Sequence, residues 1–147
     1  MFCNFLLGFD GLKIVVDGSF VGSMDQINSI AMDCGVNVLV THAYRRAEIG
    51  SDGTVRPPGP NENSPHLVGH AIDLILETPT GLCSGDCLTG TSNSNALCFT
   101  SGIGAISNLE IGEEFLNDGP IHVAHDLWKN GDTGPWNDMY YNNQQNC

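Results

Sequence analysis

The stretch SPHLVGHAIDLIL, residues 64–76, sets the expectations for both the fold and the chemistry of this chain. Its second half, residues 71–76, is an apolar run of strand length and predicts a β-strand. Asp73 lies inside that strand, and His66 lies before it, beyond Gly69, which lets the backbone turn closely. Imidazole and carboxylate groups are both good ligands for a divalent ion such as zinc. By spacing alone, however, a His-x6-Asp pair is a weak metal signal, and two polar residues around a turn are the simpler interpretation.

The pattern is more specific than this spacing. The arrangement Ser-x-His-x-x-Gly-x-Ala-x-Asp in residues 64–73 resembles the signature of the D-Ala-D-Ala carboxypeptidase-like zinc peptidases, the M15 family. Upstream, residues 40–45 read VTHAYR and look like the strand of that family that ends in a Tyr-Arg pair. The family includes dipeptidases and phage L-alanyl-D-glutamate endolysins, and the signalling domain of Hedgehog shares its fold and zinc site. The resemblance covers residues from about 24 to 128, of which only these two blocks are specific.

The resemblance implies a zinc site with three protein ligands. His66 and Asp73 would be two of them. The third would be a histidine on a later strand, for which His122 is the first choice and His125 the reserve. Three protein ligands leave the fourth position for water, which is the catalytic arrangement, and zinc brings the pKa of that water to about 7.

The resemblance also assigns substrate-binding residues. Arg45 would bind the substrate carboxylate or the oxyanion of the tetrahedral intermediate, and Tyr44 would border the same site. Ser64 would orient the metal ligands. Three of the five basic residues are Arg45, Arg46 and Arg56, so positive charge is concentrated in one stretch of an acidic chain. The alternatives are a surface arginine and an ordinary turn serine.

The general base is where the chain departs from the family. Family members usually place an acidic residue three positions before the third histidine, but three positions before His122 the chain has Gly119. Asp118, one residue earlier, is the first choice for the base. A turn aspartate beside Gly119 is the alternative interpretation. The other carboxylates within reach are Glu113, Glu114 and Asp126.

Length and charge narrow the class of protein. A chain of 147 residues predicts a single domain, residues 1–147, with a real core. Its 17 acidic and 5 basic residues give a net charge of −12, which argues against nucleic acid and anionic membranes as partners. No apolar run approaches the roughly 18 residues that span a bilayer. The apolar start of the chain lacks the basic lead-in of a signal peptide.

The cysteines favour an oxidising compartment. There are six, an even number, and we expect three disulfides and a secreted protein. Their connectivity stays open, because six cysteines allow 15 pairings. The alternative is a zinc site that uses Cys83, Cys87 and Cys98.

Local patterns predict an α+β fold, with a small, mainly antiparallel sheet, helices packed on one side and disulfide-pinned loops. Ser23 and Gln26 form a capping box, and the apolar spacing that follows predicts a helix that ends before Gly35. The other expected elements are strands at 12–17, 36–40 and 121–127, a loop at 50–64, a disulfide-pinned loop at 78–102, and one or two helical segments within 103–116.

Two functions follow from these observations. The first is a zinc peptidase that acts on short cell-wall-type peptides, with soluble fragments favoured because the strong negative charge does not suit adhesion to an anionic wall. The second is a non-catalytic secreted module, structural or binding, that keeps the fold without turnover. The displaced base favours this second function. A domain rich in Asn, Gly and Ser also suits extracellular self-assembly.

Overall fold

The structure is a computed structural model that describes residues 3–7, 13–44, 48–49, 55–56, 64–112, 119–125, 138–139 and 143. For residues 3–7, 48–49 and 55–56 it describes the backbone only. Four short strands form two antiparallel pairs. Strand β1 (Cys3–Leu7) pairs with β2 (Lys13–Asp17), and β4 (Glu48–Ile49) pairs with β5 (Val55–Arg56). The strand expected at 12–17 is therefore present as β2.

The main sheet has five antiparallel strands. They are β3 (Asn37–His42), β6 (Ala71–Thr78), β7 (Gly81–Cys83), β8 (Leu109–Gly112) and β9 (Ile121–His125). The strand order is β3-β6-β9-β8, and β7 also pairs with β6. Strand β9 pairs with residues 71–74 of β6 and β7 with residues 76–78, so β7 and β9 follow one another along the same edge of β6. This long central strand carries the apolar run seen in the sequence.

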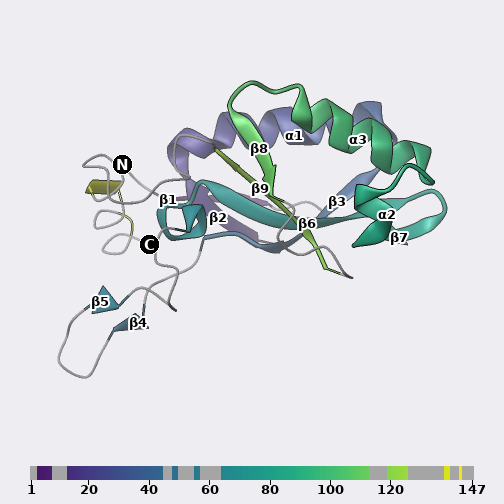
Figure 1. Cartoon of the computed structure of the whole chain (residues 1–147). Helices are drawn as coiled ribbons and strands as arrows, with labels where there is room; N and C mark the ends of the chain where they lie inside the picture. Colours follow the sequence, from purple (N-terminus) through teal and green to yellow (C-terminus); the bar gives the residue numbers. More distant parts are fainter. Residues whose placement is uncertain are drawn as a thin grey trace.

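Helices α1 (Val21–Asp33) and α3 (Ser94–Gly104) lie side by side along one face of the sheet (Figure 1). The short helix α2 (Asp86–Thr89) follows β7, and two 3-10 turns, η2 (Gly18–Phe20) and η3 (Pro65–Val68), precede α1 and β6. The predicted α+β fold with helices on one side of an antiparallel sheet is confirmed. Within the described ranges, the helices are too short or too polar to cross a bilayer.

The core lies between the sheet and the helices. Side chains alternate along a strand, so Ile72, Leu74 and Leu76 of β6 face the helices, and all three are fully buried. Burying each such side chain contributes about 1.5–3 kcal/mol to stability. Asp73 points to the opposite face, which the helices do not cover.

The first helix begins earlier than the capping box predicts. Helix α1 starts at Val21, directly after η2, so Ser23 lies within its first turn and is not the cap. The predicted capping box is wrong, because the Ser23 hydroxyl instead contacts a ring nitrogen of His125, 2.7 Å away. The end of the helix agrees with the sequence, since Gly35 has a positive φ of 65°.

Two disulfides are present among the described side chains. Cys34–Cys98 joins the end of α1 to α3, and Cys83–Cys87 closes the turn between β7 and α2. The alternative zinc site on Cys83, Cys87 and Cys98 is therefore wrong, because those thiols are used in disulfides. Cys3 and Cys147 lie outside the residues whose side chains the structure describes, so the third expected disulfide stays a prediction.

The segment after β6 differs most from expectation. Residues 78–102, predicted as a loop, contain β7, α2 and most of α3. The helices predicted within 103–116 are wrong for residues 105–112, because α3 ends at Gly104 and residues 109–112 form strand β8, while residues 113–116 lie outside the described residues. Strand β8 pairs with β9, so a partner in the sheet decides its conformation. Most of the predicted loop 50–64 lies outside the described residues.

Candidate metal centre

Two neighbouring strands place a carboxylate and an imidazole on the open face of the sheet. Asp73 of β6 and His122 of β9 are direct register partners. Paired residues in antiparallel strands project their side chains to the same face, with their Cβ atoms about 4.5–5.5 Å apart. The two side chains therefore meet on the face opposite the helices, and His122 Nδ1 lies 2.8 Å from Asp73 Oδ1.

A tight turn before β6 brings in the third side chain. His66 lies in η3, whose first residue is proline, and its backbone N–H donates a 3.4 Å hydrogen bond to the Ser64 hydroxyl. Gly69 ends the turn with φ of 73°. A Cβ at this position would lie 2.6 Å from the backbone nitrogen of Asp17, so glycine is needed both for its conformation and for space. The glycine of the sequence pattern is thus explained by packing.

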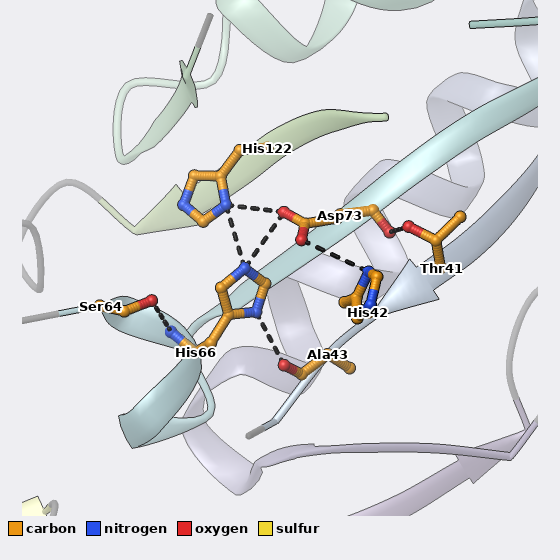
Figure 2. A network of polar contacts seen from close by, with 7 residues as sticks. All are labelled: Thr41, His42, Ala43, Ser64, His66, Asp73 and His122. Carbon is orange, nitrogen blue, oxygen red and sulfur yellow. Dashed lines mark hydrogen bonds and ion pairs between the residues drawn. The ribbon is translucent and has the colours of Figure 1, made fainter. Parts of the chain in front are cut away.

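The three side chains converge on one point (Figure 2). His66 Nε2 lies 3.1 Å from Asp73 Oδ1 and 3.1 Å from His122 Nδ1. Among the described residues, this is the group of three or more His, Cys, Asp or Glu side chains whose ligand atoms all lie within 4.8 Å of one another. Ligands bound to one zinc ion at 2.0–2.1 Å lie roughly 3.3 Å apart in a tetrahedron. The observed distances need to open by only a few tenths of an ångström to hold such an ion.

The hydrogen positions also favour a cation at this point. His66 Nδ1 lies 2.7 Å from the carbonyl oxygen of Ala43, to which it donates, so in the neutral ring Nε2 carries a lone pair. That lone pair faces Asp73 Oδ1, which is also an acceptor. A hydrogen on His122 Nδ1 can be donated to His66 Nε2 or to Asp73 Oδ1, but not to both. An added cation between them, a proton or a metal ion, removes the repulsion.

The carboxylate is held in its charged form. Burial alone would raise the pKa of Asp73, but the hydrogen bond from His122, the hydrogen bond that His66 donates once its ring is protonated, and the positive charge these rings can carry hold the pKa well below its usual range. A carboxylate that stays ionised is ready to bind a metal ion without first losing a proton.

His42 approaches the same carboxylate from β3. The register of β3 against β6 shifts between Val40 and His42, and this bulge sets His42 opposite Asp73. Its Nδ1 lies 3.7 Å from Asp73 Oδ2, and its side chain is 75% exposed. The sequence alone does not assign His42 to this cluster. The bulge that aims it at Asp73 has no signal in the sequence.

A cleft of about 290 Å³ adjoins this cluster. It is lined by His42 and Ala43, which contact Asp73 and His66 of the cluster, and by Tyr44. Its apolar walls come from Ile14, Val15 and Val40. The backbone N–H of Tyr44 donates to the carbonyl of Val15, which joins the end of β3 to β2 beside the cleft.

The predicted site residues fall into three groups: those in or beside the cluster, one that points to the other face of the sheet, and those outside the described residues. The structure brings His66, Asp73 and His122 together and places Ser64 and Tyr44 close by. His125, the reserve ligand, projects to the helical face and does not reach the cluster. Arg45 and Asp118 lie outside the described residues, as do Glu113, Glu114 and Asp126.

Comparisons with known proteins leave the geometry as the main evidence. No protein-family model, curated protein or solved structure matches the chain. The arrangement itself, two imidazole nitrogens and one carboxylate oxygen from two buried residues and the half-buried His122, is a ligand set that suits a divalent transition metal.

Proposed function

We propose that this protein is a zinc-dependent peptidase that hydrolyses short peptides of the bacterial cell-wall type. The observation that carries the proposal is the convergence of His66, Asp73 and His122 on one point, next to His42 and Ala43, which line a cleft. The His and Asp spacing of the sequence resembles zinc peptidases of the M15 family, and the geometry agrees with the ligand set that this resemblance implies. Two histidines and one carboxylate are also the protein ligands of known zinc peptidases.

The chain's own residues have distinct roles in this proposal. His66, Asp73 and His122 hold the ion, and the Ala43 carbonyl fixes the His66 ring so that Nε2 points inward. Zinc, when bound, lowers the pKa of a coordinated water and polarises a peptide carbonyl. Arg45 would bind the substrate carboxylate, and Asp118 would accept the proton of the attacking water. The cleft beside His42 and Tyr44 would receive the peptide.

The expected setting of the reaction is extracellular. The two disulfides are typical of proteins from oxidising compartments. A net charge of −12 favours soluble peptide fragments over an intact anionic wall as substrate. We therefore propose a secreted enzyme with short peptides as partners.

Metal analysis tests the first half of the proposal. Purified protein should contain about one zinc per chain, and His66→Ala and Asp73→Asn should lose it. Glu77→Gln is the matched control, because Glu77 lies on the same strand but is exposed and contacts Asn37 instead. Zinc retained in both site variants would remove the cluster from consideration as a metal site.

Hydrolysis of peptides that end in D-Ala-D-Ala, and of L-Ala-D-Glu peptides, tests the second half. Cleavage should stop with a chelator and return with added zinc. Asp118→Asn and Arg45→Ala should each lower the rate without loss of the metal. Bound zinc with no cleavage of either peptide would favour the non-catalytic secreted module, and cleavage that ignores the chelator would contradict a zinc enzyme.

A further inference from the structure

A second cluster of polar side chains lies on the helical face of the same two strands. We name it the buried chain, and its members in order of contact are Asp17, Ser19, His70, His125 and Ser23. All except Ser19 are buried, and the two histidines contact the ring of Phe20, with centroid distances of 5.7 and 4.9 Å. Polar groups in such apolar surroundings are costly unless each is hydrogen-bonded.

With both imidazole rings neutral, one set of hydrogen positions satisfies every contact along the buried chain. The Ser19 hydroxyl donates to Asp17, so His70 Nε2, 3.0 Å from that hydroxyl, must be the donor to it. His70 Nδ1 then accepts from His125 Nδ1, 2.8 Å away. His125 Nε2 in turn accepts from the Ser23 hydroxyl at 2.7 Å. The hydrogen bonds therefore run in one direction, from Ser23 to the carboxylate of Asp17.

The carboxylate at the end of the buried chain is ionised. Burial would raise the pKa of Asp17, but three groups outweigh this effect and lower the pKa from 3.8 to about 2: His70, whose Nε2 also lies 3.4 Å from Asp17 Oδ1, Ser19 and Asn143. The reversed direction of hydrogen bonding would leave no hydrogen between the Ser19 hydroxyl oxygen and Asp17 Oδ1, which lie 2.5 Å apart. The Ser19 hydroxyl therefore donates to Asp17 and not to His70, so these residues do not form a serine nucleophile with a histidine base.

The buried chain touches each of the three segments that carry a candidate metal ligand. His70 lies between His66 and Asp73, and its carbonyl accepts the backbone N–H of His125, three residues after His122. This contact closes the end of the β6–β9 ladder, in which Ala71 pairs with Ala124 and Asp73 with His122.

The turn that holds His66 is attached at the other end of the buried chain. The backbone N–H of Asp17 donates to the carbonyl of Gly69 at 3.0 Å. The Asn143 amide donates to Asp17 Oδ2 at 3.2 Å and to the Val68 carbonyl at 2.9 Å. Asp17 thus fixes the backbone of the turn, which positions the imidazole of His66 over the sheet.

We propose that His70 and His125 are positioning residues of the metal centre. Their hydrogen bond holds β6 and β9 in the register that sets Asp73 opposite His122, because a slip of one residue would turn either side chain to the helical face. A fully hydrogen-bonded buried network specifies one arrangement more sharply than apolar packing does. The proposal rests on the proposed metal site and adds residues that never contact the ion.

The test compares two substitutions of His125. His125→Leu removes both ring nitrogens at similar volume, whereas His125→Asn keeps a donor close to the place of Nδ1. Each disulfide-bonded variant is titrated with zinc against a competing chelator, and with Co²⁺, whose visible absorption reports coordination geometry. We expect His125→Leu to bind zinc on the order of tenfold more weakly, because substitutions of residues that orient metal ligands have effects of this size. Its Co²⁺ spectrum should differ from that of the wild type. His125→Asn should restore most of the affinity and the wild-type spectrum.

The outcomes distinguish this proposal from the proposed function. Wild-type zinc affinity and an unchanged Co²⁺ spectrum in a folded His125→Leu variant would overturn the positioning role while leaving the peptidase intact. A wild-type protein that binds neither ion would overturn both. If His125→Leu fails to fold, His125→Gln decides, because its amide can reach the place of Nε2 beside Ser23 but not the Nδ1 of His70. A His125→Gln variant with altered Co²⁺ absorption supports the role, and one with the wild-type spectrum contradicts it.

Discussion

The two histidine clusters of this molecule share strands β6 and β9 and differ in how their hydrogens are distributed. In the buried chain, each donor faces an acceptor, and the chain is complete without an added ion. On the face opposite the helices, His66, Asp73 and His122 bring acceptor atoms together with too few hydrogens among them. The comparison teaches that residue type alone does not separate a structural histidine from a candidate metal ligand. The difference lies in the second ring nitrogen, which faces a hydrogen-bond partner in the buried chain and another acceptor in the cluster of His66, Asp73 and His122.

The strongest test of this comparison is a pair of alanine substitutions on β9. His122→Ala should lower zinc affinity by more than about a hundredfold, since losses outside the first ligand shell already cost 10–100-fold. Its effect on the free energy of unfolding of the metal-free protein should be smaller, about 1 kcal/mol, because His122 is partly exposed and because His66 and His42 still approach the buried Asp73 carboxylate. His125→Ala should instead cost about 2–3 kcal/mol, because it leaves buried groups without partners. Chelator competition and urea unfolding measure the two effects, and similar results for both variants would contradict the distinction.

Removal of the carboxylate of the buried chain should lower stability by a similar amount. Asp17→Ala removes the acceptor for His70 and Ser19 and should lower the free energy of unfolding by about 3 kcal/mol. Asp33→Ala, at the exposed end of α1, is the matched control and should change it by less than about 0.5 kcal/mol. Urea unfolding of both variants at neutral pH is the measurement. Equal stability of the two would show that the buried carboxylate contributes nothing.

The glycine between the two clusters should show a smaller effect on stability. Gly69→Ala forces a side chain into left-handed backbone and against the Asp17 nitrogen, which should cost about 2 kcal/mol or more. Zinc affinity should fall as well, since this turn carries His66. Gly22→Ala is the control, because a Cβ there meets nothing within 4 Å and alanine favours the helix. Thermal unfolding and zinc competition distinguish the variants, and a Gly69→Ala protein as stable as wild type would refute the packing argument.

Acid should weaken the buried chain by a still smaller amount. The folded pKa of Asp17, about 2, lies below its ordinary value of 3.8, so the added stability is present above pH 3.8 and is lost as the pH falls toward 2. The loss should reach up to about 2 kcal/mol in the wild type and be absent in Asp17→Asn. Urea unfolding of both proteins at pH 5 and pH 2.5 measures the difference. The same decline in both proteins would assign the acid sensitivity to other carboxyl groups.

The parts of the fold that could be predicted are those with local signals. The apolar run of β6 and the helical spacing after Ser23 each act within a few residues, and both elements are present. His66 and Asp73 were found because a recurring pattern joins them. His122 followed only from a family resemblance, since the register that pairs it with Asp73 joins residues 49 positions apart.

Other features could not be predicted from local sequence, because the residues that determine them are distant in the chain. Ser23 matches a capping box, yet its partner is His125, 102 residues further along. Strand β8 has the apolar spacing of a helix, and β9 makes it a strand. Helix α3 does have a local signal in the sequence, although this segment is predicted to be a loop. The signal is Asn93, which caps the helix by accepting hydrogen bonds from the backbone N–H groups of Asn95 and Ala96.

The positions of the two disulfides have a consequence for how the molecule opens. Cys83 pairs with Leu76, and Cys34 lies just before the strand that begins opposite Glu77, so both covalent links reinforce the end of β6 remote from Asp73. Reductants would therefore loosen that remote end first. Backbone amide hydrogens of β6 and β9 near Asp73 and His122 would then exchange with deuterium more slowly than those of α2 and α3. The sheet would open first at the end that carries the disulfides.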